Sequence, residues 1–565
     1  MKFRVILLFL VILFLAAVLR LYGLKWDQGY SLHPDERFLV MVANDISFPG
    51  SVSGYFDTSS SPANPHNRGY NFFVYGTYPV HLVKFLAGKL SSGDYGSIMR
   101  TGRYTSAILD WSIAILVFLI TRRLTGRASP ALLAAFFYSV SVLPIQLAHF
   151  FAVDTFLVFF LVLSFYFLIS PFPYLLGLSF GLAIAAKISA SIFLPIIALG
   201  LIVYFFRTRN LFKWLLLLIT IVISFYFTVR LAQPYLFADS RLLSFSLNSK
   251  VLTNWQELKN MSRADSYFPP AIQWIHTRPV LYSLENLILW GLGVPLALIS
   301  FLSLLQLVNR LKYQPLLILP LLWILGVFIY YSTQFAQPIR YFYPAFPFLA
   351  VLSGSGFFQL LSRLPRYRIH ILTLTLPLTL IWPLAFITIY SRPHSRVSAS
   401  TWINTHIPPG SRISCEHWDD CLPLGYNAPY RIIEFPLYAQ DTPEKWQDMA
   451  TRLAGLDYII LSSNRLYGSI MTVPEIYPAT NLFYRDLFAD NLGFSKIAEF
   501  TSRPNLPLPG THICLTPPFI KYGVVTRASQ ECPLPGINFV DDYADETFTV
   551  YDHPKVIIFK KNNAL

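Results

Sequence analysis

Two adjacent carboxylates stand where the first strongly apolar stretch of the chain gives way to polar sequence. Asp35 and Glu36 lie in "YSLHPDERFLVMVAND" (30–45), shortly after an apolar segment over residues 5–24. A carboxylate at such a boundary can remove a proton from an acceptor hydroxyl or amine. The alternative is structural, because acidic residues are favoured in the first turn of a helix and both could simply begin the helix that follows.

Four further ionisable side chains lie within or beside apolar segments, where an uncompensated charge is costly. They are Asp154, Arg103, Lys187 and Arg340. Arginine and lysine can neutralise a phosphate that leaves from an activated donor. Each also has a structural interpretation: Asp154 as a helix N-cap, Lys187 as a side chain that extends to the membrane interface, and the two arginines as partners of structural acids.

The composition predicts a membrane protein whose transmembrane helices position these residues. Of 565 residues 54% are hydrophobic, 13% are charged and 16% are aromatic, and the mean hydropathy is +0.49. Segments of about 18 apolar residues can cross a hydrocarbon core of about 30 Å as helices. We identify eleven such segments, and treat the first as an anchor that is not cleaved. They are 5–24, 104–121, 129–148, 155–170, 174–187, 189–206, 213–232, 284–307, 314–332, 341–361 and 369–390.

The excess of 44 Lys and Arg over 30 Asp and Glu follows the predicted topology. Short basic clusters follow the second, sixth, eighth and tenth apolar segments. With eleven crossings all of them fall on the side of the N-terminus, as the positive-inside rule requires. This pattern predicts a cytoplasmic N-terminus in the cell membrane and gives no reason to expect a nucleic-acid partner. The six candidate residues then lie on or near the outer face, where they outline one polar cavity.

The polar stretches on the outer side predict additional structure. Within the first outer loop, residues 25–103, "DERFLVMVANDI" and "FFVYGTYPVHLVKFLAGKL" show helical spacing of apolar residues and predict two interfacial helices. After residue 390 the pattern of polar and apolar residues is typical of a soluble domain, which we expect over 391–565. There "RISCEHW", "RIIEFPLY", "DYIILSS" and "KVIIFKK" predict strands, and Thr442 and Gly455 bracket a helix, so we expect a small extracytoplasmic α/β domain.

All four cysteines lie in this C-terminal stretch. Cys415, Cys421, Cys514 and Cys532 are therefore placed where thiols can oxidise. The simplest arrangement pairs Cys415 with Cys421 and Cys514 with Cys532, although four cysteines allow three pairings and free buried thiols are an alternative.

Four stretches resemble a known family of membrane enzymes. The "DE" pair after the first apolar segment, "HFFAVDTFLVFFLVLSFYFL", "GLAIAAKISASIFLPI" and "QPIRYFYPAFPFLAVLSG" are similar to the polyprenyl-phosphate-dependent glycosyltransferases of family 39. That family includes protein O-mannosyltransferases and the bacterial lipid A aminoarabinose transferases. The resemblance covers residues 1–390 and implies a polytopic α-helical protein with the GT-C fold and about eleven transmembrane helices.

The resemblance also implies an activity and a role for each candidate residue. The activity is transfer of a sugar, with inversion, from a polyprenyl-phosphate donor to an acceptor glycan, lipid or protein on the outer face. It implies no metal and no cofactor beyond the lipid-linked donor. The implied roles are Asp35 as general base, Glu36 as its support, Asp154 as organiser of acceptor and donor, and Arg103, Lys187 and Arg340 as ligands of the donor phosphate.

Other function classes fit the sequence less well. A transporter or flippase of lipid-linked substrates is the main alternative, but coupling charges in transporters lie near the membrane centre in two similar halves, and no repeat occurs here. A non-catalytic scaffold for the outer domain would need only one span. ATP hydrolysis and serine-hydrolase chemistry are disfavoured because no Walker loop, G-x-G-x-x-G or G-x-S-x-G motif occurs.

Overall fold

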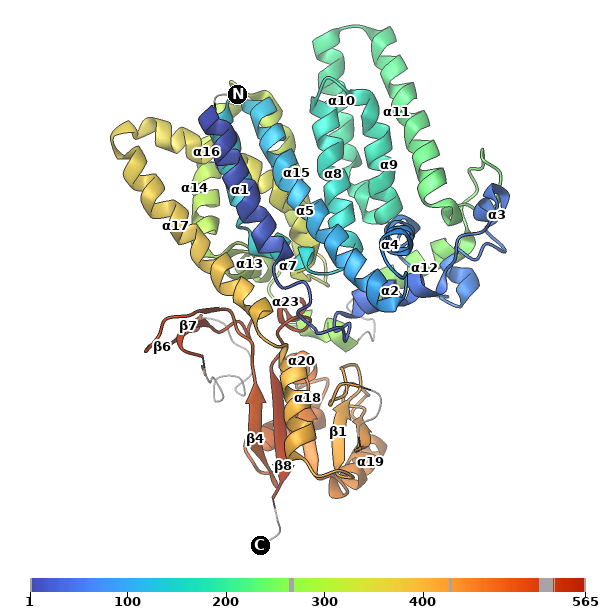
Figure 1. Ribbon diagram of the computed structural model, residues 1–565, viewed down its shortest axis with the longest axis vertical. Helices are drawn as coiled ribbons and strands as arrows, with labels where there is room; N and C mark the ends of the chain where they lie inside the picture. The colour runs from blue at the N-terminus through green and yellow to red at the C-terminus, as the bar shows by residue number, and fades with distance from the viewer. Residues whose placement is uncertain (1–2, 264–268, 426–428, 518–531, 533, 563–565) are drawn as a thin grey trace.

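The computed structural model describes residues 3–263, 269–425, 429–517, 532 and 534–562. Figure 1 shows two parts along the long axis of the molecule: a bundle of long helices at one end, and a smaller part that contains the strands at the other. The first helix, α1, belongs to the bundle, and the last strand, β8, belongs to the smaller part.

Each of the eleven predicted apolar segments falls on helical structure. The helices of the bundle are α1 (Phe3–Leu21), α5 (Tyr95–Thr125), α6 (Ala128–Ser139), α7 (Val142–Ala148), α8 (Val153–Ile169), α9 (Leu176–Ala186), α10 (Leu194–Thr208), α11 (Leu211–Ala232), α14 (Val294–Leu311), α15 (Ile318–Ser332), α16 (Phe346–Arg363) and α17 (Arg368–Ile387). Within the described ranges, seven helical stretches are long and apolar enough to cross a membrane, or nine if each of two bent pairs is one span. Helices α8 and α9 are apolar but shorter. The chain is a multi-pass membrane protein.

Two predicted spans are bent rather than straight. Helices α6 and α7 meet at 59°, and the stretches Leu281–Leu292 and Val294–Leu307 meet at 115°. The second bend occurs at Gly293, whose φ of 78° and ψ of 145° are a backbone conformation that essentially only glycine adopts. The segment expected to be one straight span over 284–307 is therefore sharply bent.

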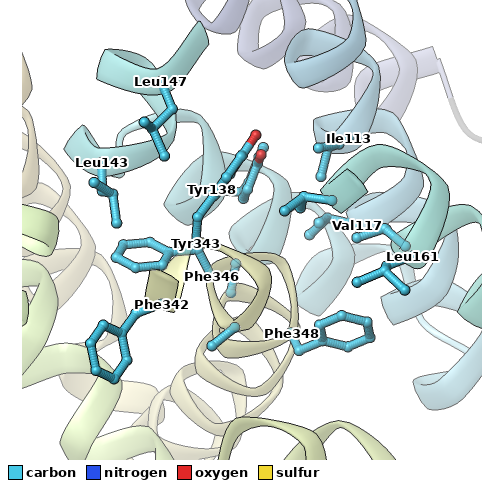
Figure 2. Close-up of a cluster of buried hydrophobic side chains, with 14 of the residues drawn as sticks. Ile113, Val117, Tyr138, Leu143, Leu147, Leu161, Phe342, Tyr343, Phe346 and Phe348 are labelled. Atoms are coloured by element: carbon cyan, nitrogen blue, oxygen red, sulfur yellow. The ribbon is translucent and has the colours of Figure 1, made fainter. Parts of the chain in front are cut away.

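A cluster of buried apolar side chains fixes the segment that carries Arg340. This segment is the short 3-10 helix η8 (Ile339–Ala345), directly before α16. Its residues Phe342 and Tyr343 are 1% and 0% exposed, and Figure 2 shows them beside Leu143 of α7 in the same cluster. Because burying each large apolar side chain contributes about 1.5–3 kcal/mol, the backbone around Arg340 is firmly held.

The loop over residues 25–103 contains the two predicted helices. They are α2 (Pro34–Asp45) and α4 (Thr77–Leu90), and the polar stretch between them holds only the short helices α3 (Val52–Phe56) and η1 (Pro65–Arg68). A further helix, α12 (Ser249–Met261), lies between α11 and α14 in the chain. Helix α5 begins at Tyr95, so that Arg103 lies in its third turn.

The smaller part is built on a mixed five-stranded sheet in the order β2-β1-β3-β8-β4. The strands are β1 (Arg412–Glu416), β2 (Arg431–Phe435), β3 (Tyr458–Leu461), β4 (Phe494–Phe500) and β8 (Val556–Lys561). Strand β1 is parallel to β2 and β3, whereas β8 is antiparallel to β3 and β4. The four strands predicted from the sequence are β1, β2, β3 and β8. A second sheet has the order β5-β7-β6 and consists of β5 (Asn505–Leu506), β6 (His512–Leu515) and β7 (Gly536–Phe539).

Helices cover both faces of the five-stranded sheet. Val556 and Ile558 of β8 pack in one cluster with α18 (Ser395–His406), and Ile557 and Phe559 pack in another with α19 (Pro443–Ala454) and α21 (Pro478–Phe488). This alternation follows from the two-residue period of a strand. Helix α19 begins at the predicted N-cap, where the Thr442 hydroxyl accepts a hydrogen bond from the Lys445 amide at 3.2 Å, and ends at Gly455.

Both disulfides join the cysteines that the simplest pairing joins. Cys415 is bonded to Cys421 and Cys514 to Cys532. The first closes a six-residue separation that begins within β1 and is buried on the Cys415 side. Asp420 lies in the loop that this disulfide closes, and its carboxylate forms an ion pair with the guanidinium of Arg37 of α2 at 2.8 Å. The disulfide-closed loop therefore contacts the helix on which Asp35 lies.

Residues 540–555, which connect β7 to β8, leave the smaller part and pack against the helical bundle. We call them the return segment; they include the short helix α23 (Glu546–Thr549). The buried Asp552 carboxylate accepts hydrogen bonds from the Gln146 amide of α7 at 3.0 Å and from the Tyr390 hydroxyl at 2.8 Å. The same Gln146 amide donates to the Phe548 carbonyl at 2.7 Å. The two parts of the chain are thus joined by buried polar contacts.

Candidate functional site

Asp35 and Arg340 form an ion pair across the polar end of the bundle. Helix α2 begins at His33, whose Nδ1 accepts the Glu36 amide at 3.3 Å, and Pro34 occupies the first turn, where its missing amide proton costs nothing. Asp35 follows directly, and its Oδ2 contacts a terminal guanidinium nitrogen of Arg340. The two side chains are 26% and 18% exposed, so the pair is accessible at one side.

The electrostatics of the pair keep Asp35 in the state that a base requires. Burial by itself would raise the pKa of Asp35, but the Arg340 guanidinium beside it outweighs burial and lowers that pKa to about 2. Asp35 is therefore ionised at neutral pH. The imidazole of His33 is neutral there, because burial lowers its pKa to about 4.

A second ion pair lies next to the first. Asp154, in the first turn of α8, accepts a hydrogen bond from the Lys187 ammonium at 2.8 Å, and Lys187 is the C-cap residue of α9. The ring of Tyr341 connects the two pairs: the Lys187 nitrogen lies 5.4 Å from its centroid and the Arg340 guanidinium 6.0 Å. Four of the six residues singled out from the sequence therefore come together, from four separate segments.

The remaining two, Glu36 and Arg103, form a separate buried group. Arg103 donates to the Glu36 carboxylate at 2.5 Å, to Asp27 at 2.6 Å and to the Leu24 carbonyl at 2.8 Å. The other Glu36 oxygen accepts the Phe151 amide at 2.8 Å. Glu36 and Arg103 are 0% and 1% exposed. The placement differs from that expected of a phosphate ligand, because the nitrogens of Arg103 already donate to carboxylates and a carbonyl.

Two other ionisable residues of the bundle, Asp110 and Arg230, also have protein partners. Asp110 is paired with Arg20 and accepts the Tyr138 hydroxyl at 2.7 Å, all of them buried. Arg230 donates to the carbonyl groups of Pro234, Asp239 and Arg241. These contacts give both residues a structural role. Within the described ranges, no group of three or more His, Cys, Asp or Glu side chains is arranged to hold a metal ion.

Two residues near Asp35, the candidate base, were not identified as site residues from the sequence. His33 is 1% exposed, and the centroid of its ring lies 4.2 Å from the ring centroid of Tyr551 in the return segment. Tyr551 belongs to "YDHPKVIIFKK", a stretch whose apolar run predicted only a strand. Its first four residues, "YDHP", were the available signal, because they combine a tyrosine, an aspartate and a histidine directly before a buried strand.

The comparisons with known proteins bear on the fold. No family model matches the chain, and no curated protein matches it. Among solved structures, the archaeal oligosaccharyltransferase AglB from Archaeoglobus fulgidus, in complex with an inhibitory peptide and a dolichol-phosphate, is similar with a TM-score of 0.51. The similarity covers 85% of this chain and 72% of that chain at 12% identity. ArnT from Cupriavidus metallidurans bound to undecaprenyl phosphate has a TM-score of 0.41 and 15% identity over 78% of this chain and 93% of that chain.

The likeness to AglB shows that the chain has the GT-C fold of membrane glycosyltransferases. The GT-C fold predicted from the sequence is thereby confirmed, together with the C-terminal part that contains α-helices and β-sheets. The narrower assignment to family 39 stays a prediction.

Proposed function

We propose that the chain transfers a sugar, with inversion, from a polyprenyl-phosphate carrier to an acceptor at the outer face of the cell membrane. The observation that carries the proposal is the ionised Asp35 held beside Arg340, with the Asp154–Lys187 pair next to both. A carboxylate base and two cations in one accessible group are what transfer from a phosphate-linked donor requires. The positive-inside pattern supports an outer location for this group and for the C-terminal part.

Arg340 and Lys187 are the ligands that we assign to the donor phosphate. The buried Nε of Arg340 has no hydrogen-bond partner among the residues that the structure describes, which leaves an N–H for a phosphate oxygen. Arginine binds phosphate through two parallel N–H groups, and lysine acts as a point charge beside it.

An apolar groove whose lining residues follow Arg340 in the chain can hold the isoprenoid tail of the donor. The groove has a volume of about 570 Å³ and lies among α14, α15 and α16. Phe342 and Phe346, which follow Arg340 by two and six positions, line it together with Phe301 and Phe328. A tail in this groove stays in an apolar environment while its phosphate reaches the polar end of the bundle.

Donor binding would activate Asp35. When the phosphate engages the Arg340 guanidinium, Asp35 loses the charge that lowers its pKa, and burial then raises its basicity. The acceptor oxygen or nitrogen attacks the anomeric carbon, and its proton passes to Asp35. The bond between that carbon and the phosphate oxygen breaks, and the electron pair leaves with the lipid phosphate.

Glu36 and Arg103 act as positioning residues in this proposal. Their buried pair joins α2 to α5 and, through the Phe151 amide, to the loop before α8. It therefore holds Asp35, directly before Glu36 on α2, and Asp154, in the first turn of α8, at a fixed separation.

The test is transfer of radiolabelled sugar from a polyprenyl-phosphate donor by the full chain in detergent. Asp35→Asn keeps the size of the side chain and removes the base, and we expect the rate to fall about 10²- to 10⁴-fold. Glu257→Gln, on the exposed face of α12, is the matched control and should transfer at the wild-type rate.

Equal rates for the two variants over a range of pH would remove Asp35 from the base role. If the wild-type chain transfers no sugar but moves lipid-linked substrates across liposome membranes, the transporter alternative takes the place of the enzyme.

A further inference from the structure

The return segment places a tyrosine of the C-terminal part directly against the start of α2. The Tyr551 ring packs on His33 with a centroid separation of 4.2 Å and contacts Phe150 edge-on at 6.5 Å. His33 is the N-cap of α2 and lies two positions before Asp35. Tyr551, near the end of the chain, thus contacts the N-cap of α2, the helix that carries the proposed base.

Hydrogen bonds on both sides fix the backbone at Tyr551. The Tyr551 carbonyl accepts from His394 Nε2 at 3.2 Å, and the next residue, Asp552, is held by Gln146 and Tyr390 of the helical bundle. A neutral His394 that donates at this nitrogen keeps the contact uncharged.

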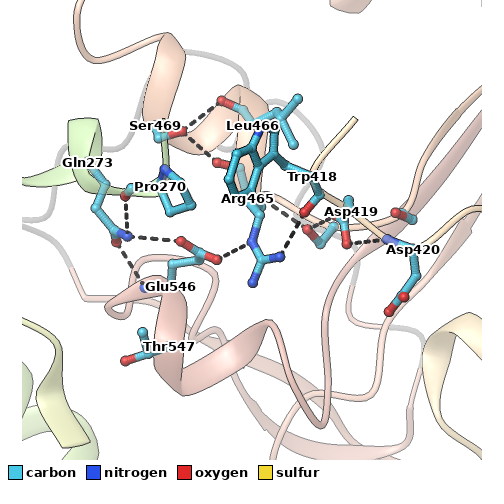
Figure 3. Close-up of polar contacts among 12 residues, drawn as sticks. Pro270, Gln273, Trp418, Asp419, Asp420, Arg465, Leu466, Ser469, Glu546 and Thr547 are labelled. Carbon is cyan, nitrogen blue, oxygen red and sulfur yellow. Dashed lines mark hydrogen bonds and ion pairs between the residues drawn. The ribbon is translucent and has the colours of Figure 1, made fainter. Parts of the chain in front are cut away.

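On the other side of Tyr551, helix α23 is anchored through Glu546. Figure 3 shows its carboxylate between Gln273, which donates to one oxygen at 2.9 Å, and Arg465, which donates to the other at 2.5 Å. The Val550 amide in turn donates to the Glu546 carbonyl at 2.9 Å. Hydrogen bonds therefore hold the backbone before and after Tyr551, and they fix the position of its side chain against His33.

The hydroxyl of Tyr551 has an unused hydrogen-bonding capacity at this place. The side chain belongs to a residue that is 7% exposed, and its oxygen has no hydrogen-bond partner within the part of the chain that the structure describes. A buried tyrosine usually finds such a partner. Burial raises the pKa of Tyr551, so the phenol is protonated and can donate; Arg340 and Asp35 are the charges that act on it most strongly.

We propose that Tyr551 completes the reaction centre, its hydroxyl donating a hydrogen bond to an oxygen of the donor phosphate that Arg340 holds. The inference rests on the proposed function and adds a catalytic residue from the C-terminal part. During transfer the leaving lipid phosphate takes the electron pair of the broken carbon–oxygen bond, and the phenol stabilises the added charge without giving up its proton. The acceptor proton goes to Asp35.

The experiment compares Tyr551→Phe with the wild-type full chain, because phenylalanine keeps the ring against His33 and removes only the hydroxyl. The probes are undecaprenyl phosphate and undecaprenol, which share the tail and differ in the phosphate. A hydrogen bond to a charged group is worth about tenfold or more in affinity. We expect Tyr551→Phe to weaken binding of undecaprenyl phosphate about tenfold and to leave binding of undecaprenol unchanged. Added inorganic phosphate should compete with undecaprenyl phosphate in the wild type and less well in the variant.

Tyr430→Phe is the matched control, since its hydroxyl donates to backbone carbonyls of α18 and the following residue within the C-terminal part. It should bind both probes as the wild type does. Equal weakening of both probes by Tyr551→Phe, or no weakening of either, would overturn the inference and leave Tyr551 a packing residue. Binding is read without sugar transfer, so failure of the proposed enzyme activity would be recognised separately, by a wild type that binds the lipid phosphate and transfers nothing.

Discussion

At the scale of single residues, the two arginines expected at the donor phosphate have different surroundings. Arg340 is partly exposed, has one bonded carboxylate and retains an N–H without a partner among the described residues. Arg103 is enclosed by Asp27, Glu36 and the Leu24 carbonyl. Binding a mobile anion requires a cation that can exchange partners, and only the first arrangement offers one.

A pair of substitutions tests this difference. Lys187→Met should lower the affinity for undecaprenyl phosphate about tenfold or more while changing the unfolding free energy by only about 1 kcal/mol, because its ion pair is partly exposed. Arg103→Met should destabilise the protein by about 3–5 kcal/mol, because it leaves two buried carboxylates without their partner. Thermal unfolding and lipid-phosphate binding, measured on the same samples, separate the two effects. A stable Arg103→Met variant that has lost phosphate affinity would return Arg103 to the role expected from the sequence.

Sequence reasoning found the acids and bases of the site because their cost in an apolar surrounding is a local property. It could not decide which of them meet. Asp35 and Arg340 are 305 positions apart, and their contact depends on how η8 packs on the bundle. Tyr551 escaped detection for the same reason, since its neighbours His33 and Phe150 come from distant parts of the chain.

At the scale of elements, the sharp bend at Gly293 is the clearest departure from the predicted spans. Apolar runs, caps and strand alternation are local, so the bundle helices, α19 and four strands could be predicted from the sequence. The bend was not, because it depends on a backbone conformation and on close packing: a Cβ at position 293 would lie 2.7 Å from Cδ1 of Trp382.

We expect Gly293→Ala to lower the unfolding free energy by about 1–3 kcal/mol, through backbone strain and the clash with Trp382. Gly326→Ala provides the control on α15, where an added Cβ meets open space; in a helix this change should be neutral or stabilise by up to about 1 kcal/mol. Thermal unfolding in one detergent measures both. Similar unfolding temperatures for the two variants would show that the bend does not need glycine.

At the scale of the whole molecule, the return segment joins the C-terminal part to the helical bundle. Gln146 is central to this contact, because its one amide group donates to both the Asp552 carboxylate and the Phe548 carbonyl. Its surroundings are buried, so loss of these bonds leaves acceptors that water does not reach.

Gln146→Leu should therefore loosen the contact without unfolding either part. We expect faster hydrogen–deuterium exchange over residues 540–555 and at least a severalfold lower transfer rate. Exchange in β1 and β3, at the centre of the five-stranded sheet, should be unchanged and serves as the internal reference. Unaltered exchange throughout the return segment would mean that other contacts suffice to hold it.

The order of synthesis gives the return segment one more consequence. Asp35 directly follows the first membrane helix and is made early, whereas Tyr551 is made only after all bundle helices and most of the C-terminal part. A half-made chain already inserted beside lipid carriers would hold the carboxylate but lack its aromatic neighbour. Newly made protein would therefore bind the donor phosphate at full strength only after its last strands have been exported and folded.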